Sequence, residues 1–154
     1  MARSAARVGA PTAVSDAALR EFVGYGMKRA FNVLQADLAR TLEPFGLRML
    51  TFSALALIAQ NPGLRPSHLA AALAVERANV VVYVDQLEQA GWVSRAPVPG
   101  DRRAYALQCT LAGRRVFARA EAAVRAHDSR MLHGLTGDEI GTLRKACAVI
   151  EGRV

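Results

Sequence analysis

The stretch from Pro66 to Thr110 constrains the fold most, because two short helical segments there precede a pair of short strands. Residues 66–73 carry apolar side chains at helical spacing behind a proline, which suits the first helical position because it has no N–H to leave unpaired. A tight link at Val75–Glu76 leads to a second segment, 77–89, which ends just before Gly91, a good C-cap. A short helix joined tightly to a longer one predicts a helix-turn-helix, whose second helix can enter the major groove of DNA.

The segment 77–89 also has a competing interpretation as a strand, because residues 80–84 are rich in valine. We favour a helix, since Val80, Val84 and Leu87 repeat at helical spacing and a polar run continues the segment to residue 90. This helix would bury those three side chains and present its opposite face to a ligand.

Two short strands are expected after this helix, at residues 92–96 and 104–108. Pro97, Pro99 and Gly100 bend the connection between them. A hairpin in this position adds a wing to the helix-turn-helix.

Apolar side chains at helical spacing predict further helices on both sides of this unit. Asp16, Thr110 and Thr136 are plausible N-caps, and Thr136 with Glu139 matches a capping box. The expected helices cover residues 16–42, 47–59 and 111–132 and a last segment that begins at Thr136. We therefore expect a mainly α fold with a small β-wing, comprising about six helices and a two- to three-stranded wing.

The net charge of +7 favours an anionic partner such as nucleic acid. The stretch 65–103 is nevertheless only weakly basic. It holds five arginines (Arg65, Arg77, Arg95, Arg102 and Arg103) against four acids (Glu76, Asp85, Glu88 and Asp101). Much of the excess charge lies in the flanking helices, which would either touch phosphates as well or serve an anionic ligand.

No catalytic or metal-binding pattern is found in the sequence. There is no nucleophile with a base at a suitable spacing, no phosphate loop and no cluster of histidines. Cys109 and Cys147 fit no metal site and are interpreted as buried apolar residues. No apolar run approaches the roughly 18 residues of a membrane span, and residues 1–15 are expected to form a flexible arm. We expect a cytoplasmic protein without enzymatic activity, cofactor or membrane association.

Three motifs in register resemble the multiple-antibiotic-resistance regulator (MarR) family. The first runs from Leu87-Glu88 through Gly91-Trp92-Val93 to Arg95, the second is Asp101-Arg102-Arg103, and the third is Thr110 with Gly113. Trp92 stands where the family commonly has leucine, and Cys109 replaces another leucine. The resemblance covers roughly residues 16–152 and implies a winged helix-turn-helix transcriptional regulator.

The resemblance implies a homodimeric repressor that binds a pseudo-palindromic operator in double-stranded DNA. Residues 16–154 would form a single domain. Within it, residues 47–110 would be the DNA-binding head, and residues 16–46 and 111–154 would be dimerisation helices. Half-sites about one helical turn apart would suit two heads related by twofold symmetry.

The resemblance also assigns roles to residues of the wing. Arg103 matches the family's minor-groove arginine, where a cation gains from the negative potential of narrow A·T tracts. Asp101 matches its orienting carboxylate, and Arg102 is a plausible phosphate or groove contact. The alternative is that Asp101 and Arg103 form a surface salt bridge that shapes the turn.

On the recognition helix, Arg77, Ala78 and Asn79 occupy the N-terminal positions that meet base edges. Arginine pairs with guanine and asparagine with adenine. Ser67 and His68, at the start of the preceding helix, are placed to donate to phosphates. The alternative to a DNA contact is that Asn79 is a solvated helix residue. For His68 the alternative is a solvated or locally capping histidine.

The segment from Gly24 to Phe31 resembles the start of a MarR branch that senses aromatic acids or their CoA thioesters. Basic and aromatic side chains would offer charge beside an aromatic cavity. In the alternative, the basic side chains are solvated or paired with Asp37 or Glu43. The candidate ligand-binding residues are Tyr25, Lys28, Arg29, Arg48, Phe52 and Trp92.

The sequence therefore predicts a transcriptional repressor that a small, aromatic anionic effector, either an aromatic acid or an aromatic acyl-CoA, releases from DNA. A second hypothesis is a ligand-binding or protein-interaction module of the same fold with weak or no DNA binding. The nearly neutral head is the feature that favours this second hypothesis.

Overall fold

The computed structural model describes residues 14–98 and 101–152, without the side chains of residues 101–104. The expected arm over residues 1–15 therefore falls almost entirely outside the described residues. The chain divides into two compact units, Met1–Val33 and Leu34–Val154.

The first unit contains helix α1 (Ala17–Arg20) and the first half of helix α2 (Val23–Leu42). The expectation of one helix over residues 16–42 is wrong, because the chain is interrupted at Glu21–Phe22. The fold consequently has seven α-helices in its described part instead of about six.

The interruption follows from how the side chain of Asp16 is used. This residue precedes α1 but makes no side-chain cap on it. Its carboxylate instead accepts hydrogen bonds from Arg20 Nε and from the Tyr25 hydroxyl, both at 2.9 Å. The Tyr25 bond joins the two sides of the interruption. Glycines at positions 24 and 26 also weaken the helical preference next to it.

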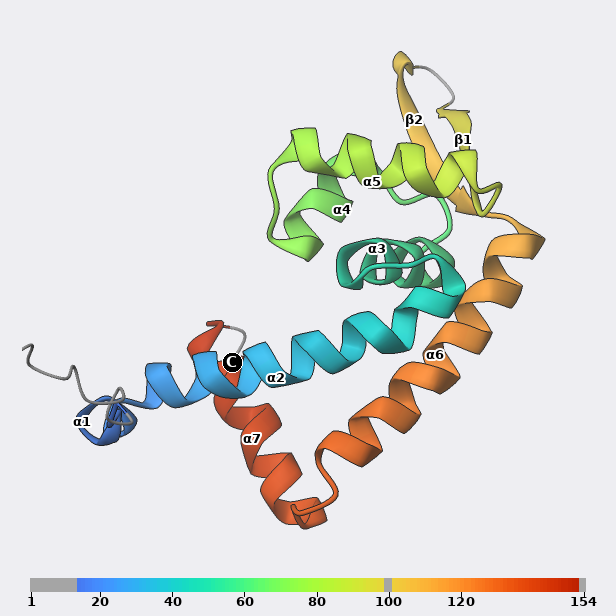
Figure 1. The fold of residues 1–154 in the computed structure, drawn as a ribbon. Coiled ribbons are helices and arrows are strands. Elements are labelled where there is room, and N and C mark those ends of the chain that lie inside the picture. The colour runs from blue at the N-terminus through green and yellow to red at the C-terminus, as the bar shows by residue number, and fades with distance from the viewer. Residues whose placement is uncertain (1–13, 99–100, 153–154) are drawn as a thin grey trace, which may run out of the picture. The chain divides into compact units, whose positions relative to one another are not determined.

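The second unit contains the expected helix-turn-helix (Figure 1). After a 3₁₀ turn at Glu43–Phe45 come α3 (Met49–Gln60), α4 (Pro66–Leu73) and α5 (Arg77–Gln89). The bounds of α4 and α5 are those predicted from the sequence. Helix, and not strand, is thus the conformation of the valine-rich segment. These helices share a core with the wing that includes Leu55, Ile58, Leu69, Val84, Leu87 and Leu107.

The wing is an antiparallel hairpin of β1 (Val93–Val98) and β2 (Asp101–Cys109). Both strands extend further toward the turn than expected. A single β-bridge between Leu64 and Leu107 adds a short third element, in which the Leu107 N–H donates to the Leu64 carbonyl at 2.9 Å. The prediction of a two- to three-stranded wing is confirmed.

Helices α6 (Leu111–Met131) and α7 (Gly137–Ile150) complete the second unit. Figure 1 shows that α6 leads away from the wing and that α7 turns back from its far end. Thr136 and Glu139 form the predicted capping box, in which the Thr136 N–H donates to the Glu139 carboxylate at 2.7 Å.

No described helix is by itself long and apolar enough to span a membrane. The segments Val23–Phe45 and Met49–Gln60 meet these criteria only as a pair, and they are bent by 65° relative to each other.

Candidate nucleic-acid interface and adjoining cavity

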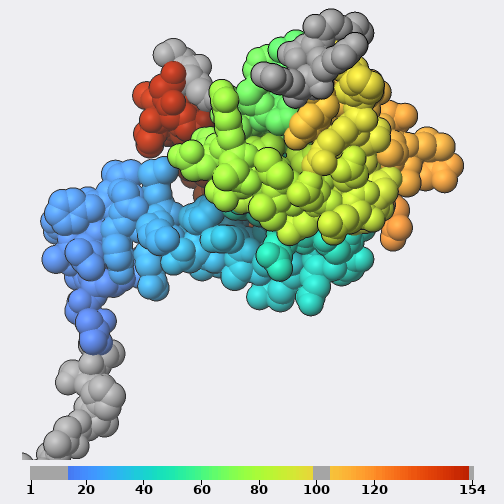
Figure 2. All heavy atoms as spheres, turned by 90° about the horizontal axis from the view of Figure 1, so that it is seen from above, coloured from blue at the N-terminus to red at the C-terminus, as the bar shows by residue number. Residues whose placement is uncertain are grey.

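Helix α5 is fixed to the head by one face and leaves the other free. On the fixed face, Val80, Val84 and Leu87 each leave at most 1% of their surface exposed. On the free face, Arg77, Ala78 and Asn79 are exposed. Figure 2 shows α5 in lime green along one face of the second unit, beside the yellow β1. The structure thus leaves the three predicted base-contacting residues open to a ligand at the start of the helix.

The link between α4 and α5 is as tight as the sequence predicted. Ala74 adopts the left-handed conformation with φ 52°, which lets the Val75 N–H donate to the Ala70 carbonyl at 3.1 Å. Of the two candidate phosphate contacts on α4, Ser67 is half-buried and His68 is exposed.

The wing candidates Asp101, Arg102 and Arg103 begin β2. Asp101 pairs with Val98 across the hairpin, next to an irregularity in the register. The side chains of these three residues lie outside the described part of the chain, so their roles stay predictions.

Arg95 joins the wing to α5. Its guanidinium forms ion pairs with Asp85 and with Glu88, the latter at 3.1 Å, and lies 5.0 Å from the centre of the Tyr105 ring. The hydrogen bond to Asp85 is the main reason that the pKa of Arg95 is raised. Arg95 thus contacts two of the four acids in the head and offsets one of their two negative charges. Glu88 and Arg95 both belong to the motif that runs from Leu87-Glu88 to Arg95, so the sequence carried a signal for this pairing, although the pairing was not predicted.

Thr110 joins the wing to both neighbouring helices. Its hydroxyl donates to the Gly91 carbonyl at 2.7 Å and accepts from the Gly113 N–H at 3.0 Å. Its own N–H donates to the Trp92 carbonyl at 2.9 Å. The Thr110–Gly113 motif therefore connects the end of α5, the start of β1 and the first turn of α6.

A cavity of about 500 Å³ adjoins α5 within the second unit. Its walls come from the last part of α2, the start of α3 and the middle of α5. Any molecule held there would touch α5 directly. The lining residues are Gln35, Ala39, Leu47, Arg48, Met49, Leu50, Thr51, Val82, Tyr83 and Gln86.

Of the six predicted ligand-binding residues, Arg48 lines this cavity. Its side chain is exposed, and no ion pair is found for it among the described residues. Phe52, one turn further along α3, packs against Phe117 with ring centres 5.9 Å apart. Trp92 lies against the turn before α3, where its ring approaches the Gly46 position.

The other three candidates, Tyr25, Lys28 and Arg29, belong to the first unit. The Tyr25 hydroxyl donates to Asp16, and this bond raises the pKa of the tyrosine. Lys28 and Arg29 are exposed. The cavity residues on α2 and α5 were missed from the sequence, because only folding brings them to the same place.

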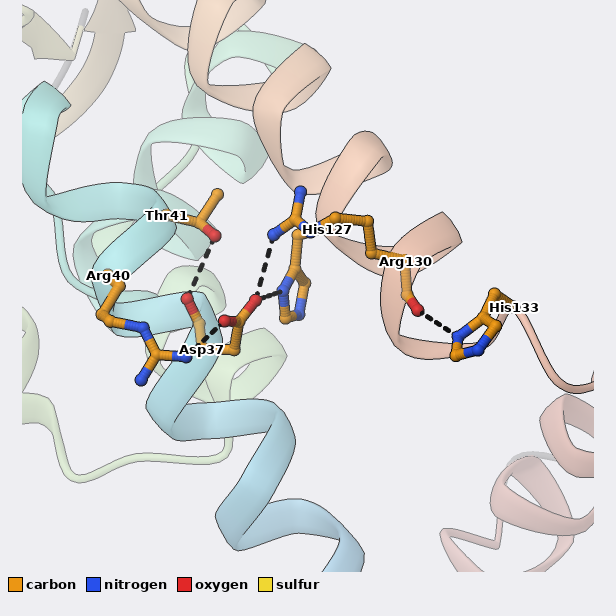
Figure 3. Close-up of polar contacts among 6 residues, drawn as sticks. All are labelled: Asp37, Arg40, Thr41, His127, Arg130 and His133. Carbon is orange, nitrogen blue, oxygen red and sulfur yellow. Dashed lines mark hydrogen bonds and ion pairs between the residues drawn. The ribbon is translucent and has the colours of Figure 1, made fainter.

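A cluster around Asp37 ties α2 to α6 (Figure 3). The Asp37 carboxylate accepts from His127 Nδ1 at 2.9 Å, from Arg130 at 3.0 Å and from Arg40 at 2.5 Å. The bond from His127, followed by that from Arg40, lowers the pKa of Asp37 to about 2. His127 is 3% exposed, so the cluster is a structural joint. No group of three metal-ligating side chains occurs within residues 14–98 and the described part of 101–152.

The sequence is similar to those of known regulators. A model of the MarR family matches residues 47–105. A candidate transcriptional regulatory protein for the hcr operon of Thauera aromatica is 37% identical over 122 residues, which are 79% of this chain and 74% of that protein. An HTH-type transcriptional repressor of Mycobacterium tuberculosis is 34% identical over 117 residues, which are 76% and 84% of the two chains.

Solved structures of similar proteins include complexes with DNA and with aromatic ligands. The repressor CouR bound to a 23-mer DNA duplex has a TM-score of 0.86 and 33% identity, covering 91% of this chain and 99% of that one. CouR from Rhodococcus jostii RHA1 bound to p-coumaroyl-CoA has a TM-score of 0.79 and 29% identity, covering 88% and 95%. A Mycobacterium tuberculosis MarR family protein with salicylic acid has a TM-score of 0.67 and 31% identity, covering 84% and 96%.

Proposed function

The chain belongs to the MarR family of DNA-binding transcriptional repressors, and from this premise we propose that it is a homodimer that leaves its operator when a small aromatic anion binds beside α5. The operator is a pseudo-palindromic duplex, and the protein acts in the cytoplasm, where that duplex lies. The observation that carries the proposal is the cavity of about 500 Å³ that Arg48 and three residues of α5 share.

The charge arrangement of the head supports DNA binding over the alternative of a module without it. Arg95 pairs with both Asp85 and Glu88 and offsets one of their two negative charges, which reduces their repulsion of phosphates near the wing. Arg77 and Asn79 remain exposed at the start of α5, at the positions suited to base edges. A few placed contacts can therefore carry the binding without a strongly basic surface.

The cavity supports an aromatic anion as the effector. Its walls are mostly apolar, and Arg48 brings a guanidinium that suits a carboxylate or a phosphate. The similar CouR and Mycobacterium tuberculosis structures contain p-coumaroyl-CoA and salicylic acid, respectively. These two compounds represent the two effector classes predicted from the sequence.

The place of the cavity supplies a mechanism for release. Val82, Tyr83 and Gln86 are its walls on one side, and Arg77 to Asn79 lie on the same rigid helix. If the effector fits the cavity best when α5 is displaced from its DNA-bound position, it binds the DNA-free form more tightly than the DNA-bound form. Linkage then requires that the effector weaken DNA binding by the same factor.

The proposal is tested with the full chain, salicylic acid and p-coumaroyl-CoA. We expect one of these ligands to raise the melting temperature and to release a fluorescent duplex from the region upstream of the protein's own gene. Arg48→Ala should raise the ligand Kd at least tenfold, since it removes the one charged side chain of the cavity. DNA affinity without ligand should change little.

Arg115→Ala is the matched control, because Arg115 is an exposed arginine on α6 away from the cavity lining. Equal ligand affinity of Arg48→Ala and the wild type would rule out the cavity as the effector site. Ligand binding without any DNA binding at moderate salt would favour the alternative module.

A further inference from the structure

The exposed face of α5 carries large apolar side chains that the core does not bury. Within the described part of residues 47–110, Val81 and Val82 are the large apolar side chains left exposed, with 46% and 51% of their surface open. Neither is favoured by the helix itself, because β-branched residues are weak helix formers. Val82 also lines the cavity beside α5, but neither valine is buried in the core, so core packing does not explain two adjacent exposed valines here.

These valines form one patch with Ala78. The three residues are spaced i, i+3 and i+4, so their side chains adjoin on the helix surface. The patch faces away from the buried Val80 and Val84. It lies in the N-terminal half of the helix, where a recognition helix meets base edges.

The major-groove edge of DNA offers one apolar group, the C5 methyl of thymine. Alanine and valine side chains have no hydrogen-bonding atoms, so they gain nothing from guanine or adenine and bury apolar surface only against this methyl. The neighbouring Asn79 has the amide that pairs with adenine. An A·T pair therefore satisfies both kinds of side chain on this face.

We propose that Ala78, Val81 and Val82 select operators by burying a thymine methyl group in each half-site. This assignment rests on the DNA-binding function proposed above and names the base chemistry that the helix recognises. Each buried methyl should contribute about fourfold in affinity, and two half-sites together about 15-fold.

The test begins with random-sequence duplexes from which the full-length protein selects a binding pool. The pool is then amplified in parallel with dTTP and with dUTP, which differ by the C5 methyl alone. Fluorescence anisotropy at one salt concentration and without effector gives the Kd for each pool. We expect the wild type to bind the uracil pool about 15-fold more weakly, or about fourfold if one half-site dominates.

Val81→Ser/Val82→Ser should bind the thymine pool more weakly and lose most of the discrimination between the pools. Val14→Ser is the control, since it changes an exposed valine before α1 and should keep the full discrimination. Circular dichroism verifies that each variant is folded.

Equal affinity of the wild type for both pools would overturn the inference and leave DNA binding intact. Discrimination that persists in the double variant would also overturn it, because the methyl would then act through DNA shape. If the wild type enriches no duplex at all, the proposed function fails and the inference with it.

Discussion

Gly113 lies so close to the backbone of Trp92 that no side chain fits there. An ideal Cβ would be 2.1 Å from the Trp92 carbonyl oxygen and 2.9 Å from the sulfur of Cys109. Gly113→Ala must therefore push α6 away from the start of the wing. We expect the free energy of unfolding to fall by roughly 1–3 kcal/mol, as in other overpacked sites. Urea denaturation followed by circular dichroism measures the change.

Gly141→Ala provides the matched control for this prediction. Gly141 lies within α7, and a Cβ there would meet nothing within 4 Å. Because alanine is the better helix former, the control should gain about 0.5–1 kcal/mol. If Gly113→Ala proved as stable as the wild type, the Thr110–Gly113 joint would not constrain the contact between α6 and the wing.

At the scale of elements, Arg95 sets the position of the wing relative to α5. Arg95→Met keeps a long side chain at this position but removes the guanidinium that contacts Tyr105, Asp85 and Glu88. The two freed carboxylates would then repel the phosphates of a bound duplex. We expect DNA affinity to fall about fivefold, or roughly 1 kcal/mol, with little loss of stability. Anisotropy titrations at fixed salt measure the affinity.

Asp85→Asn/Glu88→Gln in the Arg95→Met background separates the two possible causes. Recovery of affinity would assign the loss to charge, whereas a persistent loss would assign it to a misplaced wing. If Arg95→Met bound DNA with unchanged affinity, the ion pairs of Arg95 with Asp85 and Glu88 would have no role in DNA binding.

Elements with local signals were predicted well. Pro66 and Gly91 mark the limits of α4 and α5, and Thr110 and Thr136 cap α6 and α7 through hydrogen bonds within one turn. The interruption before α2 was not predicted, because it depends on the bond between Tyr25 and Asp16, nine residues apart. The spacing of apolar residues along a helix does not indicate a side-chain hydrogen bond of this kind.

The site divides in the same way. Arg77, Ala78 and Asn79 were found because their exposure follows from the periodicity of one helix. Arg48 was found as a cation next to aromatic residues, but its cavity partners on α2 and α5 depend on tertiary packing. The bond between Asp37 and His127 spans 90 residues, so no sequence spacing indicated it.

For the whole molecule, the structure shows how some arginines of α6 are used within the chain. Arg125 pairs with Glu121, Arg130 pairs with Asp37, and Arg119 lies 5.7 Å from the centre of the Phe45 ring. These arginines of α6 are thus engaged by side chains of the chain itself. These arginines are therefore less available to phosphates, and the proposed dimer would let two heads share the binding of one operator.

Helix α7 carries exposed apolar side chains that the proposed dimer would cover. Leu143, Val149 and Ile150 are exposed although they are large and apolar, and Ile150 leaves 64% of its surface open. If a second copy covers them, Ile150→Lys places a charge in the interface and should yield monomers. Separate monomers lose the high effective concentration of the second half-site, so operator affinity should fall by roughly 100-fold or more.

Light scattering after size-exclusion chromatography gives the molar mass, and anisotropy gives the operator affinity. Val14→Lys adds the same charge at an exposed valine outside the proposed dimerisation helices and should remain dimeric. Because the substitution lies on α7 and leaves α5 unchanged, Ile150→Lys should keep the affinity of a monomer for one half-site. A dimeric Ile150→Lys protein would show that the two copies meet through other residues, and a wild type that is monomeric at micromolar concentration would exclude the dimer altogether.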